Sequence, residues 1–208
     1  MLAALRAISL IYLCSVGGVS YALAETEFSK PVADANGTIT ILVAYHSLSG
    51  STEQMARAVV AGAKGVPGTH VELSRVGKVT GEQLFASDAV IVGSPVYWSN
   101  MAGEVKTFFD DWQFKHGVFP EFKMQNKVGA AFTTGGQISS GKEVTMLTIL
   151  AAMLGNKMII VSEGGAFGAS ATTEGASPGI DDHELAEARA LGKRVAEVTW
   201  MVKRGRHE

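Results

Sequence analysis

The sequence predicts an α/β fold, a doubly wound five-stranded parallel sheet with helices on both faces. Five segments rich in β-branched and apolar residues alternate with five segments of helical periodicity. The first of them, residues 39–44, is almost uninterruptedly apolar, as expected of a strand buried on both faces of a parallel sheet. A turn rich in serine joins it directly to the first helical segment. This alternation indicates strand-helix-strand crossovers, which produce parallel strands.

The elements are expected in a regular order along the chain. The predicted strands cover residues 38–45, 69–76, 88–94, 127–134 and 157–163. The predicted helices cover residues 51–64, 81–86, 100–114, 142–154 and 182–203. In the last helix, apolar residues recur at steps of three or four and predict one buried stripe. Trp200 falls outside that stripe, which leaves it as a rim residue or as part of a subunit contact.

Composition limits the possible functions. A chain of 208 residues suffices for one domain with a core that needs no cross-links. The net charge of −2 implies neither nucleic acid nor an acidic membrane surface as a partner. The single cysteine, Cys14, excludes a disulfide framework, and the five histidines have no metal-ligand spacing. We therefore expect no metal site.

The N-terminal segment differs from the rest of the chain. Arg6 precedes an apolar run, and Ala22, Leu23 and Ala24 fit the small-x-small pattern of a signal-peptide cleavage site. We expect residues 1–24 to be a signal peptide, residues 25–37 a linker, and residues 38–208 the domain. The protein would then be exported, either periplasmic or secreted. The alternative is a membrane anchor formed by residues 7–24.

A candidate phosphate site follows the first predicted strand. The turn supplies four hydroxyls and several backbone N–H groups at the start of a helix, where the helix dipole favours an anion. The first cation after it, Arg57, lies beyond the turn. The alternative is that these residues only form a turn and cap the helix. We call this segment the first loop; it consists of Ser47, Leu48, Ser49, Gly50, Ser51 and Thr52.

Two further loops follow the third and fourth predicted strands. In a doubly wound sheet the ligand lies beyond the carboxyl ends of the strands, so all three loops are expected to converge. The second loop has two aromatic residues that could cover a ring or pack against the core. The third loop has glycines that allow close backbone approach. Their candidate residues are Pro95, Val96, Tyr97, Trp98 and Asn100 in the second loop, and Thr133, Thr134, Gly135, Gly136 and Gln137 in the third.

These motifs resemble a known family. The first loop resembles the FMN phosphate loop of flavodoxin-like proteins, and residues 93–103 with 105–110 resemble the isoalloxazine loop and following helix of WrbA-type NAD(P)H:quinone oxidoreductases. Residues 131–137 and 171–175 resemble later loops of the same proteins. The resemblance implies the strand order 2-1-3-4-5 and FMN bound by the three loops.

The resemblance also implies an activity. FMN would take two electrons from NADPH or NADH and pass them to a quinone, with donor and acceptor occupying one pocket in turn and no side chain acting as nucleophile or base. A homo-oligomer, dimer or tetramer, is expected. The alternative is a flavodoxin-type electron carrier without its own substrate, although such carriers tend to be strongly acidic. A third possibility is a flavin-free interaction module.

One motif points elsewhere. Residues 136–142, ending in Gly141 and Lys142, match the start of a nucleoside-triphosphate loop. Glu143 replaces the serine or threonine that would hold magnesium, and its carboxylate would repel a triphosphate. Nucleotide hydrolysis is therefore not expected.

Overall fold

The computed structural model describes residues 15–16, 19–20, 37–173 and 179–205. The predicted signal peptide or anchor and the linker lie almost wholly outside these residues. Within residues 1–24, two short strands, β1 (Ser15–Val16) and β2 (Val19–Ser20), pair antiparallel. In the part of the chain that is described, we find no helix with the length and apolar character needed to span a bilayer.

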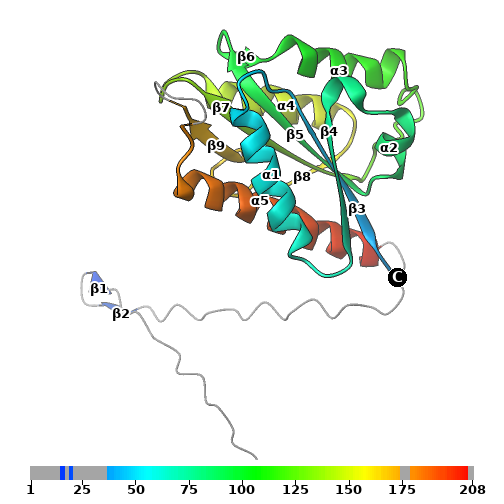
Figure 1. Cartoon of the computed structure of the whole chain (residues 1–208). Coiled ribbons are helices and arrows are strands. Elements are labelled where there is room, and N and C mark those ends of the chain that lie inside the picture. The colour runs from blue at the N-terminus through cyan, green and yellow to red at the C-terminus, as the bar shows by residue number, and fades with distance from the viewer. Residues whose placement is uncertain (1–14, 17–18, 21–36, 174–178, 206–208) are drawn as a thin grey trace, which may run out of the picture. The chain divides into compact units, whose positions relative to one another are not determined.

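The domain is built on a parallel sheet in the order β4-β3-β5-β7-β8, with β9 also pairing with β7 (Figure 1). In the numbering of the predicted strands this is 2-1-3-4-5, which confirms the predicted fold class. A two-residue strand, β6, pairs antiparallel with the end of β5. The strands are β3 (Ile39–Tyr45), β4 (Thr69–Arg75), β5 (Ala89–Tyr97), β6 (Asn100–Met101), β7 (Val128–Gly135), β8 (Ile159–Ile160) and β9 (Ala169–Thr172).

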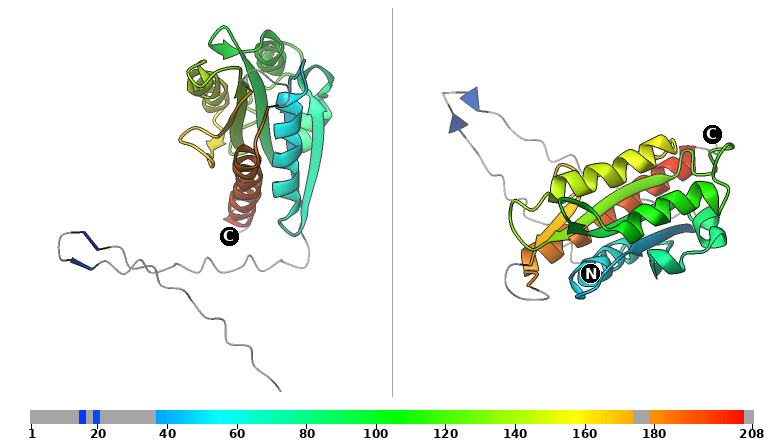
Figure 2. Two further views of the ribbon diagram at one scale, coloured as in Figure 1. Left: turned by 60° about the vertical axis from the view of Figure 1, so that its left-hand side comes forward. Right: turned by 90° about the horizontal axis from the view of Figure 1, so that it is seen from above.

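Helices cover both faces of the sheet and form two apolar cores (Figure 2). The helices α1 (Ser51–Lys64) and α5 (Asp182–Gly205) pack together on one face. The helices α2 (Gly81–Ala86), α3 (Gly103–Phe114) and α4 (Lys142–Gly155) cover the other, and the 3-10 helix η1 (Val76–Lys78) follows β4. In β3, alternate side chains enter opposite cores: Ile41 and Val43 face α1 and α5, whereas Leu42 and Ala44 face the other side. The unbroken apolar run thus arises from burial on both faces.

Glycines allow α1 and α5 to lie against each other. A Cβ on Gly62 would stand 1.9 Å from the Arg189 carbonyl oxygen, and one on Gly192 would stand 1.9 Å from that of Val59. The backbones touch at both positions, so only glycine fits. Trp200 belongs to the same face: it is buried, and its Nε1 donates to the Pro67 carbonyl oxygen at 3.2 Å. Of the two roles left open by the sequence, a subunit contact does not fit this burial.

Two predicted elements were wrong in their extent. The fifth strand, expected over 157–163, is divided into β8 and β9, because the backbone leaves the sheet near Gly164 (φ +83°) and returns after Gly168 (φ +137°). The third helix, expected from Asn100, begins at Gly103. Residues 97–101 instead form a hairpin. The sequence analysis missed it because the residues that follow have helical spacing.

Candidate functional site

The three candidate loops meet at the carboxyl ends of β3, β5 and β7. Tyr45 at the end of β3 is in register with Gly93 of β5, and Ser94 of β5 with Thr133 of β7. A hydrogen bond joins the first loop to the third directly: the Oγ1 atoms of Thr52 and Thr134 lie 2.8 Å apart, and both residues are buried. The predicted convergence of the loops is thus present in the fold.

The first loop turns sharply into α1. Gly50, the residue before the helix, has a left-handed backbone (φ +95°), and a Cβ there would meet nothing within 4 Å. Having no side chain, it cannot cap α1. Its own amide donates to the Ser47 Oγ at 3.1 Å, and the Oγ atoms of Ser49 and Ser51 lie 3.4 Å apart. Ser47 and Ser51 are buried, whereas Ser49 is exposed and Gly50 borders open space. Hydroxyls, backbone amides and a helix N-terminus gathered in one turn are the donor set that suits a phosphate.

A charged cluster supports the back of the first loop. Arg75, the last residue of β4, donates from Nη1 to the Ser47 carbonyl oxygen at 2.6 Å and from Nη2 to Glu53 at 2.8 Å. Its guanidinium also lies 5.3 Å from the centre of the Tyr45 ring. The sequence analysis missed Arg75, because only the parallel register of β3 and β4 places it beside Tyr45.

Glu53 is the anionic centre of this cluster. Its carboxylate also accepts from Arg57 at 2.6 Å, so the predicted first cation after the loop is already paired. Hydrogen bonds from Arg57, the main cause, and from the Tyr45 hydroxyl lower the pKa of Glu53. Burial and the bond to Glu53 raise the pKa of Tyr45. With two arginines and one carboxylate, the cluster keeps a net positive charge near the loop.

The second loop is a β-hairpin with a strained tip. Val96 pairs with Met101 and Tyr97 with Asn100, leaving Trp98 and Ser99 as the two turn residues. Both have positive φ (50° and 61°), as in a type I′ turn, which normally favours glycine or asparagine. Trp98 is fully exposed. A bulky residue held in this conformation at a loop tip is typical of a functional site.

Ser94 fixes the base of the hairpin. Its Oγ accepts from the Ala102 amide at 2.9 Å, and its carbonyl oxygen accepts from the Thr133 hydroxyl at 2.7 Å. The bond to Thr133 makes that predicted ligand residue a structural link between the second and third loops. Asn100 likewise is engaged within the protein: its Oδ1 accepts from the Met101 amide at 2.8 Å and from Thr148 at 3.0 Å.

Beside the second loop, the rings of His46 and Tyr97 lie nearly perpendicular to each other, with ring centres 6.1 Å apart. Its Nε2 lies 3.7 Å from a Glu104 carboxylate oxygen, which is too far for a hydrogen bond. Burial raises the pKa of Tyr97. We therefore expect the Tyr97 hydroxyl to stay protonated and able to donate at neutral pH.

In the third loop the protein backbone borders open space. Gly136 and Gln137 are exposed, and a Cβ on Gly136 would meet nothing within 4 Å. Gly135 is buried, with its carbonyl oxygen accepting from the Thr173 amide at 2.9 Å. Of the residues predicted by the late-loop resemblance, 174 and 175 lie outside the described residues.

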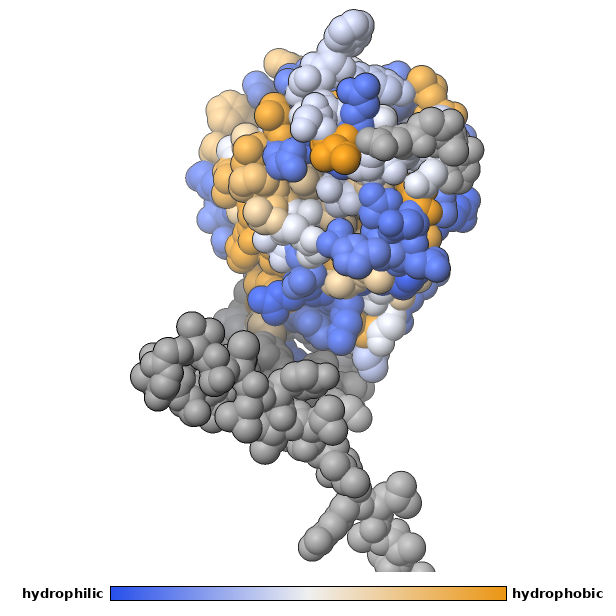
Figure 3. Space-filling model, turned by 90° about the vertical axis from the view of Figure 1, so that its left-hand side faces the viewer, coloured by the Kyte–Doolittle hydropathy of each residue, from blue (hydrophilic) through white to orange (hydrophobic). Residues whose placement is uncertain are grey.

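Each loop exposes one large apolar side chain. Leu48 is 78% exposed, Trp98 101% and Ile138, just after the third loop, 73%. The face shown in Figure 3 has both hydrophobic and hydrophilic residues. Exposed apolar groups beside hydroxyls and backbone amides suit a ligand with a ring system and an anionic end. FMN has both features, so the residues present fit this group.

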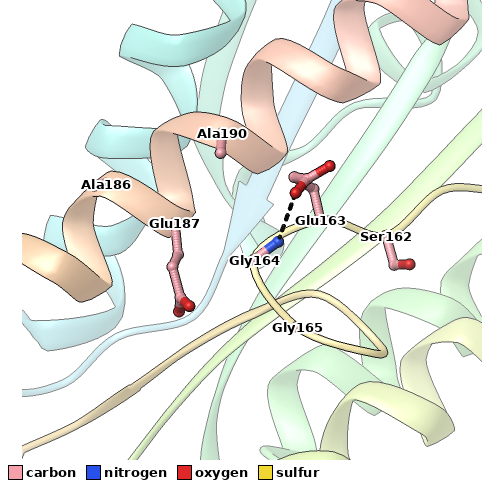
Figure 4. Close-up of a pocket in the computed structure, with 7 residues that line it drawn as sticks. All are labelled: Ser162, Glu163, Gly164, Gly165, Ala186, Glu187 and Ala190. Atoms are coloured by element: carbon pink, nitrogen blue, oxygen red, sulfur yellow. Dashed lines mark hydrogen bonds between the residues drawn. The ribbon is translucent and has the colours of Figure 1, made fainter. Parts of the chain in front are cut away.

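A separate hollow lies between α5 and the segment that divides β8 from β9 (Figure 4). It is lined by Ser162, Glu163, Gly164, Gly165, Ala186, Glu187 and Ala190. The Glu163 carboxylate accepts from the Gly164 amide at 3.4 Å. Two carboxylates without an aromatic ring or a cation do not suit a phosphorylated ring, so the candidate site remains at the three loops.

The doubly wound sheet and its three loops define a flavodoxin-like protein. Residues 38–173 match the NADPH-dependent FMN reductase family, and the chain belongs to this family. It is 33% identical over 191 residues to an NAD(P)H dehydrogenase (quinone) of Archaeoglobus fulgidus, covering 76% of this chain and 96% of that protein. It is 32% identical over 158 residues to a flavodoxin of Clostridium saccharobutylicum, covering 75% of this chain and 94% of that protein.

A solved structure shares the fold at similar coverage. The flavodoxin, WrbA-like protein from Agrobacterium tumefaciens has 26% sequence identity and a TM-score of 0.67, covering 79% of this chain and 99% of its own. The predicted family resemblance is thus confirmed.

Proposed function

We propose that this protein reduces a quinone with electrons from NADPH or NADH, through FMN bound at the three loops. The family and its named relatives support an FMN-dependent NAD(P)H oxidoreductase. FMN is the cofactor, and it supplies hydride chemistry when bound. The quinone as acceptor is the finer part of the proposal and is taken from the printed names of relatives.

The residues have distinct tasks in this proposal. The hydroxyls and amides of the first loop hold the phosphate at the start of α1. The hairpin with Tyr97 and Trp98 borders the ring, and the backbone of Gly135 and Gly136 approaches its polar edge. The hydride chemistry belongs to the cofactor, so the protein's tasks are to bind and orient FMN and to exclude water from it. The observation that carries the proposal is the buried bond between Thr52 and Thr134, because it joins the phosphate end of the site to the ring end.

Reconstitution tests this proposal. The purified protein is loaded with FMN and mixed rapidly with NADPH or NADH, and the flavin absorbance is followed. We expect the donor to bleach the flavin and an added benzoquinone or naphthoquinone to restore it repeatedly. Retained FMN that neither donor bleaches would leave only the carrier function, and a protein that takes up no FMN would refute both.

The second candidate function is an electron carrier that receives electrons from a separate reductase. It is favoured by the similarity to a clostridial flavodoxin over most of the chain. The net charge of −2 argues against it, because carriers dock through strong acidic surfaces. Direct reduction by NADPH or NADH separates the two candidates.

Self-association is also proposed. The helix α4 buries Met146, Ile149 and Met153 but exposes a second apolar stripe at Val144, Leu147 and Leu154. A helix that is apolar on opposite sides is normally covered on both. Light scattering of the purified protein should give a dimer or tetramer, and Leu147→Glu should shift it toward a monomer.

Export remains a proposal as well. It is supported by the apolar run and small residues before Glu25. Mass spectrometry of the protein from its native cells should find a mature N-terminus near residue 25, and an intact residue 1–24 segment in the membrane fraction would favour the anchor instead.

A further inference from the structure

Lys142 is a buried cation that the proposed function does not use. It is the first residue of α4 and only 7% exposed, and its Nζ donates to the Thr172 Oγ1 on β9. Across residues 37–173 and 179–205 this Nζ forms no ion pair, and the Glu184 carboxylate on α5 accepts instead from the Thr172 amide at 2.7 Å. Lysine is seldom buried without a partner of opposite charge, since desolvating its ammonium costs free energy.

Its position is at the edge of the candidate site. The Lys142 Cγ and Cδ lie 3.0 and 3.3 Å from where a Cβ on Gly135 would stand, so the side chain passes directly under the third loop. Thr172, which accepts from Nζ, is in register with Gly135 between β9 and β7. The ammonium therefore lies at the carboxyl ends of these two strands, where doubly wound sheets bind ligands.

A second polar group in the same place lacks a partner. The Ser140 Oγ is buried, and no hydrogen-bond partner for it occurs in the described part of the chain. It lies 2.2 Å from the position of a Cβ on Gly135, on the side of the third loop that Lys142 also contacts. A cation and an unpaired hydroxyl under one loop indicate that the loop is built to face a negatively charged group. Ser140 and Lys142 belong to residues 136–142, which match the start of a nucleoside-triphosphate loop. The carboxylate of Glu143 argues against a triphosphate as the ligand.

We propose that Lys142 supplies the positive charge that favours the reduced form of the bound FMN. This inference rests on the proposed function. Hydride transfer moves two electrons and one proton from NAD(P)H to the neutral ring, which leaves the ring singly negative and the donor as NAD(P)⁺. The added charge is shared by the pyrimidine end of the ring, the polar edge that the proposed function places beside Gly135 and Gly136 of the third loop. Lys142 keeps its proton throughout and acts only through its charge, so it is a tuning residue and not a catalytic one.

The size of the effect follows from electrostatics. At an effective dielectric constant of about 20, two opposite unit charges up to about 10 Å apart attract strongly enough to change an equilibrium at least tenfold. Removing the charge should therefore weaken binding of reduced FMN relative to oxidised FMN by about tenfold or more. For a two-electron couple, tenfold corresponds to about 30 mV in the midpoint potential.

The experiment measures the midpoint potential of the FMN-loaded protein against a reference dye. Lys142→Met retains the length and apolar stem of the side chain but removes its charge, and Lys142→Arg retains the charge. Lys193→Met is the matched control, because it removes an exposed lysine of α5 that is paired with Glu197 at 3.8 Å. Far-UV circular dichroism and the dissociation constant of oxidised FMN are measured on each variant.

We expect Lys142→Met to lower the potential by about 30 mV or more, with oxidised FMN bound nearly as tightly as in the parent. Lys142→Arg and Lys193→Met should stay near the parent value. A folded Lys142→Met protein whose potential equals that of the parent would overturn the inference, and would fit a purely structural role in hydrogen bonding or packing. Should Lys142→Met not fold, an unchanged potential in Lys142→Gln would overturn it equally. If the parent itself takes up no FMN, the proposed function fails first, so the two failures are distinguishable.

Discussion

Replacing Thr52 by valine tests the candidate site most directly. The two side chains have nearly the same shape, but valine lacks the hydroxyl, whose oxygen lies 2.8 Å from the Thr134 Oγ1. If Thr134 donates in this bond, the hydrogen of Thr52 is left to point at an anion in the first loop. The substitution therefore removes a link between two loops and, under the proposed function, one donor to the FMN phosphate.

The burial of these two hydroxyls sets the expected loss of stability and of FMN affinity. Thr52 and Thr134 are 1% and 4% exposed, so the variant leaves a buried hydroxyl without this partner. We expect the free energy of unfolding without FMN to fall by about 1–2 kcal/mol. A hydrogen bond to a charged group contributes about 1.5–3 kcal/mol, so the dissociation constant of FMN should rise by about 10- to 100-fold.

Fluorescence titration of FMN measures the affinity, and urea unfolding followed by circular dichroism measures the stability. Thr199→Val is the matched control: Thr199 is also buried, and its hydroxyl donates to the Val195 carbonyl oxygen at 2.7 Å within α5, away from the loops. It should leave FMN affinity unchanged. A folded Thr52→Val protein that binds FMN as tightly as the parent would refute the assignment of the first loop.

Three further substitutions test the surroundings of the site. Arg75→Met frees the Ser47 carbonyl oxygen, so we expect FMN affinity to fall by about three- to tenfold and stability by about 1 kcal/mol, measured by the same titration and unfolding. The pKa of Glu53 is lowered from 4.5, so the stability that its carboxylate contributes is complete above that pH and is lost as the pH falls. We expect Glu53→Gln to lower the free energy of unfolding by about 0.5–1 kcal/mol at pH 7 and to make stability depend less on pH in acid. An unchanged pH dependence of unfolding would contradict the role of the Glu53 ion pairs. Trp98→Gly relieves the positive φ and should stabilise the FMN-free protein by about 0.5–1 kcal/mol while weakening FMN binding; lower stability in urea would show that the turn is not strained.

The sequence predicted most of the elements, for a local reason. The helices α1 and α2 begin and end where expected, because the residues that start them are their neighbours in the chain. Gly50 directly precedes α1, and Thr80, whose hydroxyl accepts from the Gln83 amide at 3.2 Å, directly precedes α2. The first loop was also predictable, because its hydroxyls, glycine and helix start are neighbours in the chain. The hairpin at Trp98 was missed, because its pairing competes with the helical pattern of α3, which begins at Gly103, two residues after the end of β6.

The sequence by itself determined the fold class, the order of its strands and the three loops, because each depends on patterns within about ten residues and on a family resemblance that those patterns carry. The tertiary structure alone decided which distant groups meet: Arg75 behind Ser47, Thr52 against Thr134, and the Lys142 side chain under Gly135. These pairs are set by strand register and by packing of helices on the sheet. Contacts of that kind depend on the whole fold, so no local pattern of residues predicts them.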